Sequence, residues 1–70
     1  MGQSEIELFG ARIKELRKHE GVTQQALADL CDVDIRTIQR IEKGEYAPGL
    51  DVVFSISRAF NVHVSVLFRF

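Results

Sequence analysis

The sequence has a single cysteine and no long apolar run, and these absences exclude several classes of protein. Cys31 has no partner for a disulfide within the chain, and no Cys/His cluster has the spacing of a metal site. No apolar stretch approaches the roughly 18 residues that a membrane span requires. Residues 1–5 also lack the basic start and apolar run of a secretory signal. We therefore expect a cytoplasmic protein with no metal, no cofactor and no membrane contact.

Side chains that carry chemistry are few as well. One cysteine, two histidines and scattered acids show no nucleophile–base arrangement and no phosphate loop, so an enzyme is not expected. An excess of positive charge is also lacking, because nine Lys and Arg stand against ten Asp and Glu, a net charge of −1. This balance argues mildly against a nucleic-acid partner, unless the basic residues gather on one face.

The length of 70 residues predicts a single domain, residues 1–70, with a thin margin of stability. No disulfide or metal is expected to stabilise so small a core. We therefore expect oligomerisation to add stability, and a homodimer is the simplest form. We also expect no ligand-sensing domain. Regulation would then come from concentration, from competition or from a separate regulatory protein.

Capping and stop signals divide the chain into helical segments. Ser4 with Glu7 forms a capping box, Thr23 and Asp34 are good N-caps, and Gly21 supplies a left-handed stop. Between such signals, apolar residues recur at helical spacing. The predicted helices cover residues 5–19, 24–31, 35–43 and 50–60. We expect the second helix to present Leu27, Ala28, Leu30 and Cys31 to the core, and the fourth helix to present Leu50, Val53, Ile56 and Phe60.

The tail, residues 62–70, is ambiguous. Its apolar residues alternate, which favours a strand, but a lone strand in a helical chain has nothing local to pair with. We therefore favour a short fifth helix over residues 64–68, and an intersubunit strand remains the alternative. The predicted fold is all-α, a compact bundle of five short helices.

Two short helices joined by a tight turn, here 24–31 and 35–43, form a helix-turn-helix unit whose second helix enters the major groove of DNA. On a helical wheel, Ile38 and Ile41 share one side of residues 35–43, with Glu42 beside them. The opposite side carries three cations and one amide, and no acid. These are Arg36, Gln39, Arg40 and Lys43, with Ile35 at their edge.

That chemistry suits a surface that reads bases. Arginine donates two parallel hydrogen bonds to guanine, glutamine does the same to adenine, and an apolar side chain packs on the thymine methyl group. We predict base contacts from Ile35, Arg36, Gln39 and Arg40. Phosphate contacts are predicted from Thr23, Gln24, Thr37 and Lys43. The helical wheel alone is equally compatible with an alternative, in which these residues form a solvated basic face on an ordinary helical bundle.

Two charges stand where apolar residues are expected. Arg17 lies at the margin of the first helix's apolar stripe, and Glu42 lies on the inward side of the third helix. Because an isolated buried charge is expensive, a salt bridge between them would explain both. The alternative is two partly exposed charges whose tips reach solvent.

The stretch RIKELRKHEGVTQQALA, residues 12–28, resembles the opening of the lambda-repressor and Cro type of helix-turn-helix protein, the XRE family. The similarity extends from about Phe9 to Phe68, and Arg17 with Glu42 match the family's inter-helix ion pair. The positions that the family buries are held by Leu27, Ala28, Val33, Ile38 and Ile41. Departures occur at Asp32, where glycine is usual, and at Glu45, in a loop that is often basic. The resemblance therefore implies a left-handed backbone at Asp32, which aspartate tolerates moderately.

The resemblance implies a transcriptional regulator that binds double-stranded DNA at a palindromic operator as a dimer. It places base-reading at Ile35, Arg36, Gln39 and Arg40, and phosphate contacts at Gln24 and Lys43. It also implies that the tail is helical and that this end of the domain forms the two-fold contact. We therefore assign the excess of apolar residues there to the dimer interface, with simple intramolecular packing as the alternative. The assigned residues are Phe54, Val64, Val66, Phe68 and Phe70.

A rival interpretation is a non-enzymatic protein-interaction adaptor, or an antitoxin component, with the same helical fold. An adaptor has no need for Arg36, Gln39 and Arg40 to face outward together, so their placement separates the two. Phage lysogeny control, restriction–modification control and antitoxin function are all compatible with this sequence.

Overall fold

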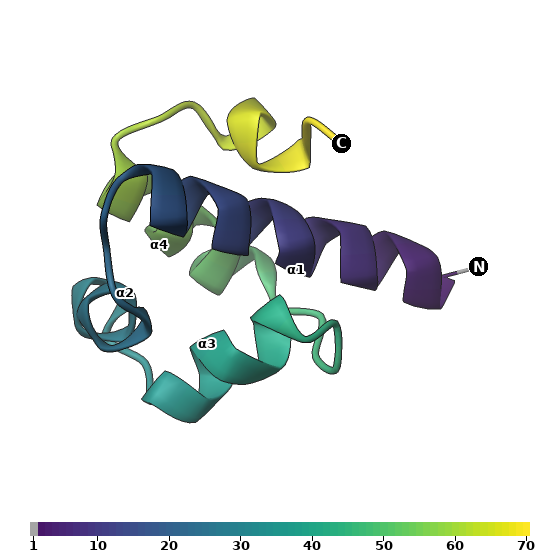
Figure 1. Cartoon of the computed structure of the whole chain (residues 1–70), viewed down its shortest axis with the longest axis horizontal. Coiled ribbons are helices and arrows are strands. Elements are labelled where there is room, and N and C mark those ends of the chain that lie inside the picture. Colours follow the sequence, from purple (N-terminus) through teal and green to yellow (C-terminus); the bar gives the residue numbers. More distant parts are fainter. Residues whose placement is uncertain (1) are drawn as a thin grey trace.

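The computed structural model describes residues 2–70, which form four α-helices followed by a short 3-10 helix (Figure 1). No strand occurs among these residues. The all-α fold predicted from the sequence is confirmed. In chain order the elements are α1 (Gly2–His19), α2 (Gln24–Cys31), α3 (Ile35–Glu42), α4 (Leu50–Phe60) and η1 (Val64–Phe68).

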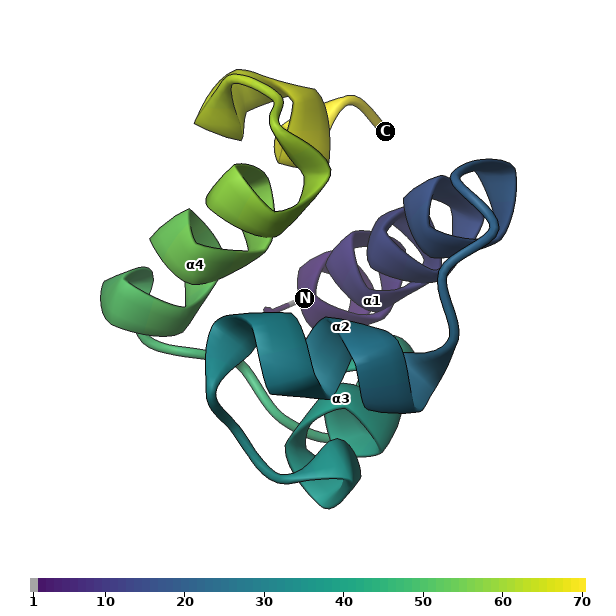
Figure 2. The ribbon, with the colours of Figure 1, turned by 90° about the vertical axis from the view of Figure 1, so that its left-hand side faces the viewer.

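Helix α1 lies between α3 and the C-terminal segment and contacts both. Both views show α3 on one side of α1 and the C-terminal segment on the opposite side (Figures 1 and 2). Helix α2 contacts both α3 and α4, and η1 contacts both α1 and α4. Every element gives at least one fully buried side chain to the core, which is therefore continuous through the bundle. These side chains are Ile13, Leu27, Ile38, Ile41, Ile56 and Leu67.

The turn between α2 and α3 is built as the sequence predicts. Asp32 adopts the left-handed conformation (φ 55°, ψ 46°), which aspartate tolerates better than most residues. The side chain of Asp34 then accepts a hydrogen bond from the Arg36 amide at 2.8 Å and caps α3. Thr23 caps α2 in the same way, accepting from the Ala26 amide at 3.0 Å.

Two predicted helix ends are wrong. Helix α1 begins at Gly2 rather than Glu5, so Ser4 lies inside the helix and the proposed capping box with Glu7 does not form its start. The amides that a Ser4 cap would serve, those of Ile6 and Glu7, lie beyond the unpaired first turn of this longer helix and bond to its own carbonyls. Helix α3 ends at Glu42, and Lys43 is its C-cap, followed by Gly44 in the left-handed region (φ 74°).

The fifth predicted helix is a 3-10 helix rather than an α-helix, and the strand alternative is wrong. Residues three apart share a face in this geometry, so Val64 and Leu67 both pack on the core, and Leu67 is fully buried. Nδ1 of His63 accepts a hydrogen bond from the Ser65 amide at 3.1 Å and caps the segment. Nε of Arg12 donates to the Val66 carbonyl at 3.0 Å and ties the segment to α1.

Two leucines that we expected to be buried are exposed. Leu30 is 62% exposed, because α2 packs through Leu27, Ala28 and Cys31 on its other faces. Leu50 is 71% exposed, because it is the first residue of α4 and lies at the edge of the bundle. The expected burial of Cys31 is confirmed, and that burial raises the pKa of its thiol, an effect that the nearby Arg58 partly offsets.

Helices α1 and α3 approach each other at Gly10. A Cβ atom at this position would overlap the carbonyl oxygen of Ile41 and lie 3.1 Å from that of Glu42. Only glycine therefore allows this spacing of the two helices. Gly10 is not among the residues predicted to matter, although a glycine inside a helical pattern often has a packing reason.

Candidate nucleic-acid interface

Helix α3 is anchored from beneath by two isoleucines. Ile38 and Ile41 are fully buried, and they point away from the cationic side of the helix. Ile35, at the first position, is partly buried against the same core. A helix of eight residues is too short to be stable alone, so this packing holds it in place.

The predicted ion pair between Arg17 and Glu42 is present and bidentate. Nε of Arg17 donates to Oε2 of Glu42 at 2.6 Å, and Nη2 donates to Oε1 at 3.0 Å. The third arm, Nη1, donates to the Val22 carbonyl at 2.9 Å. The side chains of Arg17 and Glu42 are 11% and 3% exposed, so the alternative of solvent-reaching tips is wrong. The hydrogen bond to Glu42 raises the pKa of Arg17, although burial opposes it.

This network also includes α2. Nε2 of Gln24, the first residue of α2, donates to Oε1 of Glu42 at 3.0 Å. One carboxylate of α3 therefore joins α1 and α2, and it fixes both helices of the helix-turn-helix unit against α1. The sequence predicts a phosphate contact for Gln24 and gives no sign of its bond to Glu42. The amide of Gln24 retains its second N–H and its carbonyl oxygen for another partner.

The outer side of α3 presents the cations that we predicted. Arg36, Arg40 and Lys43 are exposed, and Gln39 lies beside them, partly buried. Among residues 2–70 no hydrogen bond or ion pair engages the side chains of Arg36, Gln39 or Lys43. Their donors are therefore available, and Arg36, Gln39 and Arg40 lie together on the outer side of α3.

Other predicted contact residues surround this face. Thr23 is exposed, and its hydroxyl can still donate while it accepts from the Ala26 amide. Thr37 is partly buried. The turn before α3 is acidic, because Asp32 and Asp34 are both exposed. Within the helix-turn-helix unit the exposed cations therefore lie on α3, and the turn itself is poorly suited to phosphate contact.

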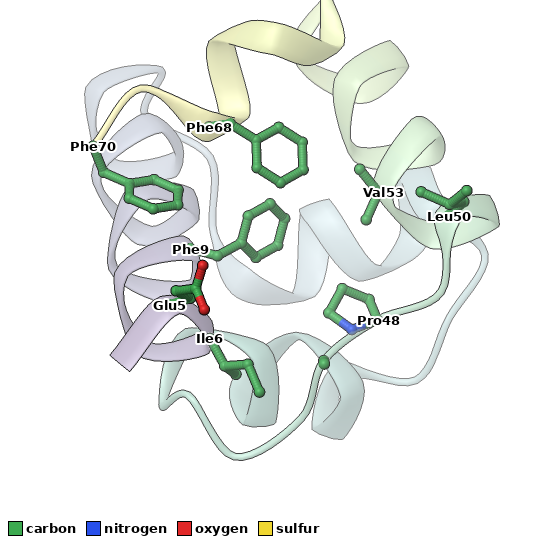
Figure 3. Close-up of a pocket in the computed structure, with 9 residues that line it drawn as sticks. Glu5, Ile6, Phe9, Pro48, Leu50, Val53, Phe68 and Phe70 are labelled. Carbon is green, nitrogen blue, oxygen red and sulfur yellow. The ribbon is translucent and has the colours of Figure 1, made fainter. Parts of the chain in front are cut away.

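A second surface is apolar and lies away from the outer side of α3. Phe54, Phe68 and Phe70 are 44%, 49% and 57% exposed, whereas Val64 and Val66 are partly buried. A hollow of about 330 Å³ opens beside the tail (Figure 3). Its lining comes from the start of α1, residues 47–48, the start of α4 and the tail. The lining residues are Glu5, Ile6, Phe9, Ala47, Pro48, Leu50, Val53, Phe68 and Phe70.

We call the exposed lining residues Leu50, Phe68 and Phe70, together with Phe54, the apolar surface. Of the other two residues assigned to a dimer interface, Val64 packs against the protein's own core, and Val66 is partly buried. Phe68 is shared, because its ring also packs on Phe9 with the centroids 5.1 Å apart.

No group of three or more His, Cys, Asp or Glu residues within the described chain is arranged to hold a metal ion. No helix over residues 2–70 is long and apolar enough to span a membrane.

Comparison with known proteins agrees with this geometry. The helix-turn-helix family model HTH_3 matches residues 13–67. An uncharacterized HTH-type transcriptional regulator from Archaeoglobus fulgidus is 42% identical over 59 residues, covering 84% of each chain. A competence pilus inhibition repressor from Acinetobacter baylyi is 34% identical over 60 residues, covering 86% of this chain and 54% of the repressor.

The fold is similar to solved structures of regulators. The restriction–modification controller protein C.AhdI from Aeromonas hydrophila superposes with a TM-score of 0.91 at 28% identity, covering 93% of this chain and 98% of that protein. The family match spans α2, the turn and α3. In the structure, the buried ion pair between Arg17 and Glu42 holds α3 against the bundle. The chain belongs to the HTH_3 family, the XRE-type helix-turn-helix proteins that bind DNA and regulate transcription.

Proposed function

We propose that this protein is a non-enzymatic, sequence-specific regulator that binds double-stranded DNA with α3 in the major groove. One observation carries the proposal. The outer side of α3 presents Arg36, Gln39 and Arg40 together, while Ile38 and Ile41 anchor the helix beneath them. Arginine and glutamine are the side chains that bind guanine and adenine with two hydrogen bonds each in that groove.

We propose that two copies bind as a dimer through the apolar surface. In a two-fold interface the same face of each copy meets its partner. A side chain that projects from one copy must therefore fit a hollow on the other. This surface has both, because Leu50 and Phe70 project beside the hollow that they help to line. Exposed aromatic side chains gathered around an apolar hollow are typical of protein interfaces.

A dimer of this kind defines the form of the operator. The two α3 helices would enter successive major grooves about 34 Å apart, one turn of the duplex. The operator would then be an inverted repeat. None of the residues that line the hollow comes from α3, so both surfaces can be occupied at once.

The direct test is selection of bound duplexes from a random pool, followed by sequencing. We expect enrichment of a short inverted repeat whose half-site centres are about 10 base pairs apart. Enrichment of a single half-site would contradict dimeric binding and leave base-reading intact. A pool with no enriched sequence at low salt would contradict the proposal as a whole and favour the protein-interaction adaptor.

Arg40→Ala should reduce affinity for the selected operator by about 1–3 kcal/mol and relax the preference at one base pair of each half-site. The physical reason is the loss of a two-donor contact with a base edge. Affinity for operator and for random duplex would be measured by fluorescence anisotropy. Equal losses on both duplexes would remove Arg40 from the base-reading residues.

Lys43→Ala should weaken binding to all duplexes by a similar factor, because a lysine at the end of α3 is suited to a phosphate rather than a base. The slope of log K against log salt should become less steep by about one unit per protein chain. Anisotropy titrations at several salt concentrations would measure it. A changed base preference with an unchanged salt slope would contradict this assignment.

Phe70→Glu should shift the protein from dimer toward monomer, because a charge in an apolar interface must be desolvated without a partner. Leu30→Glu is the matched control, since Leu30 is similarly exposed but lies on α2 outside the apolar surface. Sedimentation velocity over a range of concentrations would measure both. Equal oligomeric states for the two variants would show that the dimer, if present, uses another face.

A further inference from the structure

We infer that Tyr46 is a positioning residue for Arg40, one that holds its guanidinium ready to read a base. This inference rests on the proposed function. Tyr46 lies in the loop after α3 and belongs to none of the predicted contact residues. Its ring is the one partner that the structure gives to the Arg40 side chain, which is otherwise without a hydrogen bond or ion pair in the described chain.

The geometry is that of a cation–π contact. Cζ of Arg40 lies 5.6 Å from the centroid of the Tyr46 ring. Attraction between a guanidinium and an aromatic face extends to about 6 Å. Tyr46 is 38% exposed, so the contact lies at the surface, where a DNA duplex can reach Arg40.

The loop that carries Tyr46 is itself fixed in place. The Glu45 amide donates to the Arg40 carbonyl at 2.9 Å, and the Gly44 amide donates to the Ile41 carbonyl at 3.0 Å. On the other side of Tyr46, Ala47 and Pro48 line the hollow beneath the apolar surface. The backbone before the ring is therefore hydrogen-bonded to α3, and the two residues after it lie at the edge of the hollow.

A ring in this place leaves Arg40 able to read a base. A cation–π contact uses the charge of the guanidinium and not a hydrogen bond, and no hydrogen bond engages the five N–H donors of Arg40 within the described chain. Holding the side chain also lowers the conformational entropy that is lost when it binds. Arg36, one turn earlier on α3, has no such partner in the described chain. The two arginines thus differ in how far they are ordered before DNA arrives.

The experiment compares Tyr46→Phe, which keeps the ring, with Tyr46→Leu, which removes it. In the free protein, NMR would follow the ring-current shift of the Arg40 side-chain protons, and circular dichroism would confirm that both variants are folded. On DNA, affinity would be measured for the selected operator, for operators changed at the base pair that Arg40 reads, and for random duplex.

We expect Tyr46→Phe to retain both the ring-current shift and the base preference. Tyr46→Leu should lose the shift and bind the operator about two- to fivefold more weakly per half-site, the change that corresponds to an exposed cation–π contact. It should bind random duplex as the unsubstituted protein does. In an Arg40→Ala background, Tyr46→Leu should have no further effect, because no guanidinium remains to position.

Three results would overturn the inference. A loss in Tyr46→Phe as large as that in Tyr46→Leu would mean that the hydroxyl contacts DNA directly. An unchanged base preference in Tyr46→Leu, with Arg40→Ala still altering it, would remove the positioning role and leave the proposed function standing. An unsubstituted protein with no preferred duplex would overturn the proposed function, and this inference with it.

Discussion

Replacing Glu42 with alanine is expected to lower the free energy of unfolding by about 3–5 kcal/mol, the cost of leaving a buried charge without its partner. Arg17, whose side chain is only 11% exposed beside Glu42, would lose both hydrogen bonds to the carboxylate and keep only the Val22 carbonyl as partner. Gln24 would lose its bond as well. Urea or thermal unfolding followed by circular dichroism would measure the change.

Glu15→Ala is the matched control for this substitution. Glu15 also pairs with an arginine, at 2.5 Å from Arg12, but its side chain is 68% exposed. A surface pair of this kind contributes about 0–1 kcal/mol, so the control should unfold close to the unsubstituted protein. Similar small losses for both variants would show that the Arg17–Glu42 pair does not hold α3 in place.

Gly10→Ala is expected to destabilise the protein by at least about 3 kcal/mol, at or above the upper end of the usual cost of overpacking. The added methyl group would overlap the Ile41 carbonyl oxygen, and a backbone oxygen cannot move aside as a flexible side chain can. Helices α1 and α3 would have to separate, which would also stretch the Arg17–Glu42 pair. Thermal unfolding would measure the loss.

The neighbouring residue provides a control with the opposite chemistry. Ala11 is exposed in the interior of the same helix, so Ala11→Gly should cost about 1 kcal/mol through helix propensity alone. Gly10→Ala should thus destabilise the protein although alanine forms helices better than glycine does. Ala11→Gly should destabilise it because glycine forms helices less well. A stabilising effect of Gly10→Ala would contradict the close approach of α1 and α3.

The sequence predicted local features well, because each depends on a few adjacent residues. The caps at Thr23 and Asp34 and the left-handed turn at Asp32 follow from side chains that bond nearby amides or tolerate that backbone. The inward isoleucines of α3 follow from helical periodicity. The Arg17–Glu42 pair was predictable because two charges stood at apolar positions.

Features that depend on contacts across the bundle were predicted less well. The burial of Leu67 in a 3-10 segment depends on Arg12 and on the core beneath it, so the alternation of the tail indicated a strand that does not form. Leu30 and Leu50 fit the apolar pattern, but the neighbouring elements leave them uncovered. The second partner of Glu42, Gln24, could be found only after α2 and α3 were placed side by side.

The buried ion pair and the exposed cations act together in the proposed mechanism. Glu42 follows Arg40 by two residues on α3 and points the opposite way, into α1 and α2. Because the carboxylate fixes the rotation of α3 about its own axis, it also fixes the direction in which Arg36 and Arg40 face. Sequence-specific reading needs side chains held in place in this way, since a misplaced donor loses its base contact.

The most direct test is an NMR titration of the 15N-labelled protein with its selected operator and with a scrambled duplex of equal length. We predict that the operator shifts the amide signals of residues 35–40 most strongly, and the side-chain signals of Arg36, Gln39 and Arg40 with them. The scrambled duplex should give smaller shifts at the same residues. Shifts gathered on α4 and the tail, with α3 unchanged, would contradict the assignment of α3 as the helix that reads DNA.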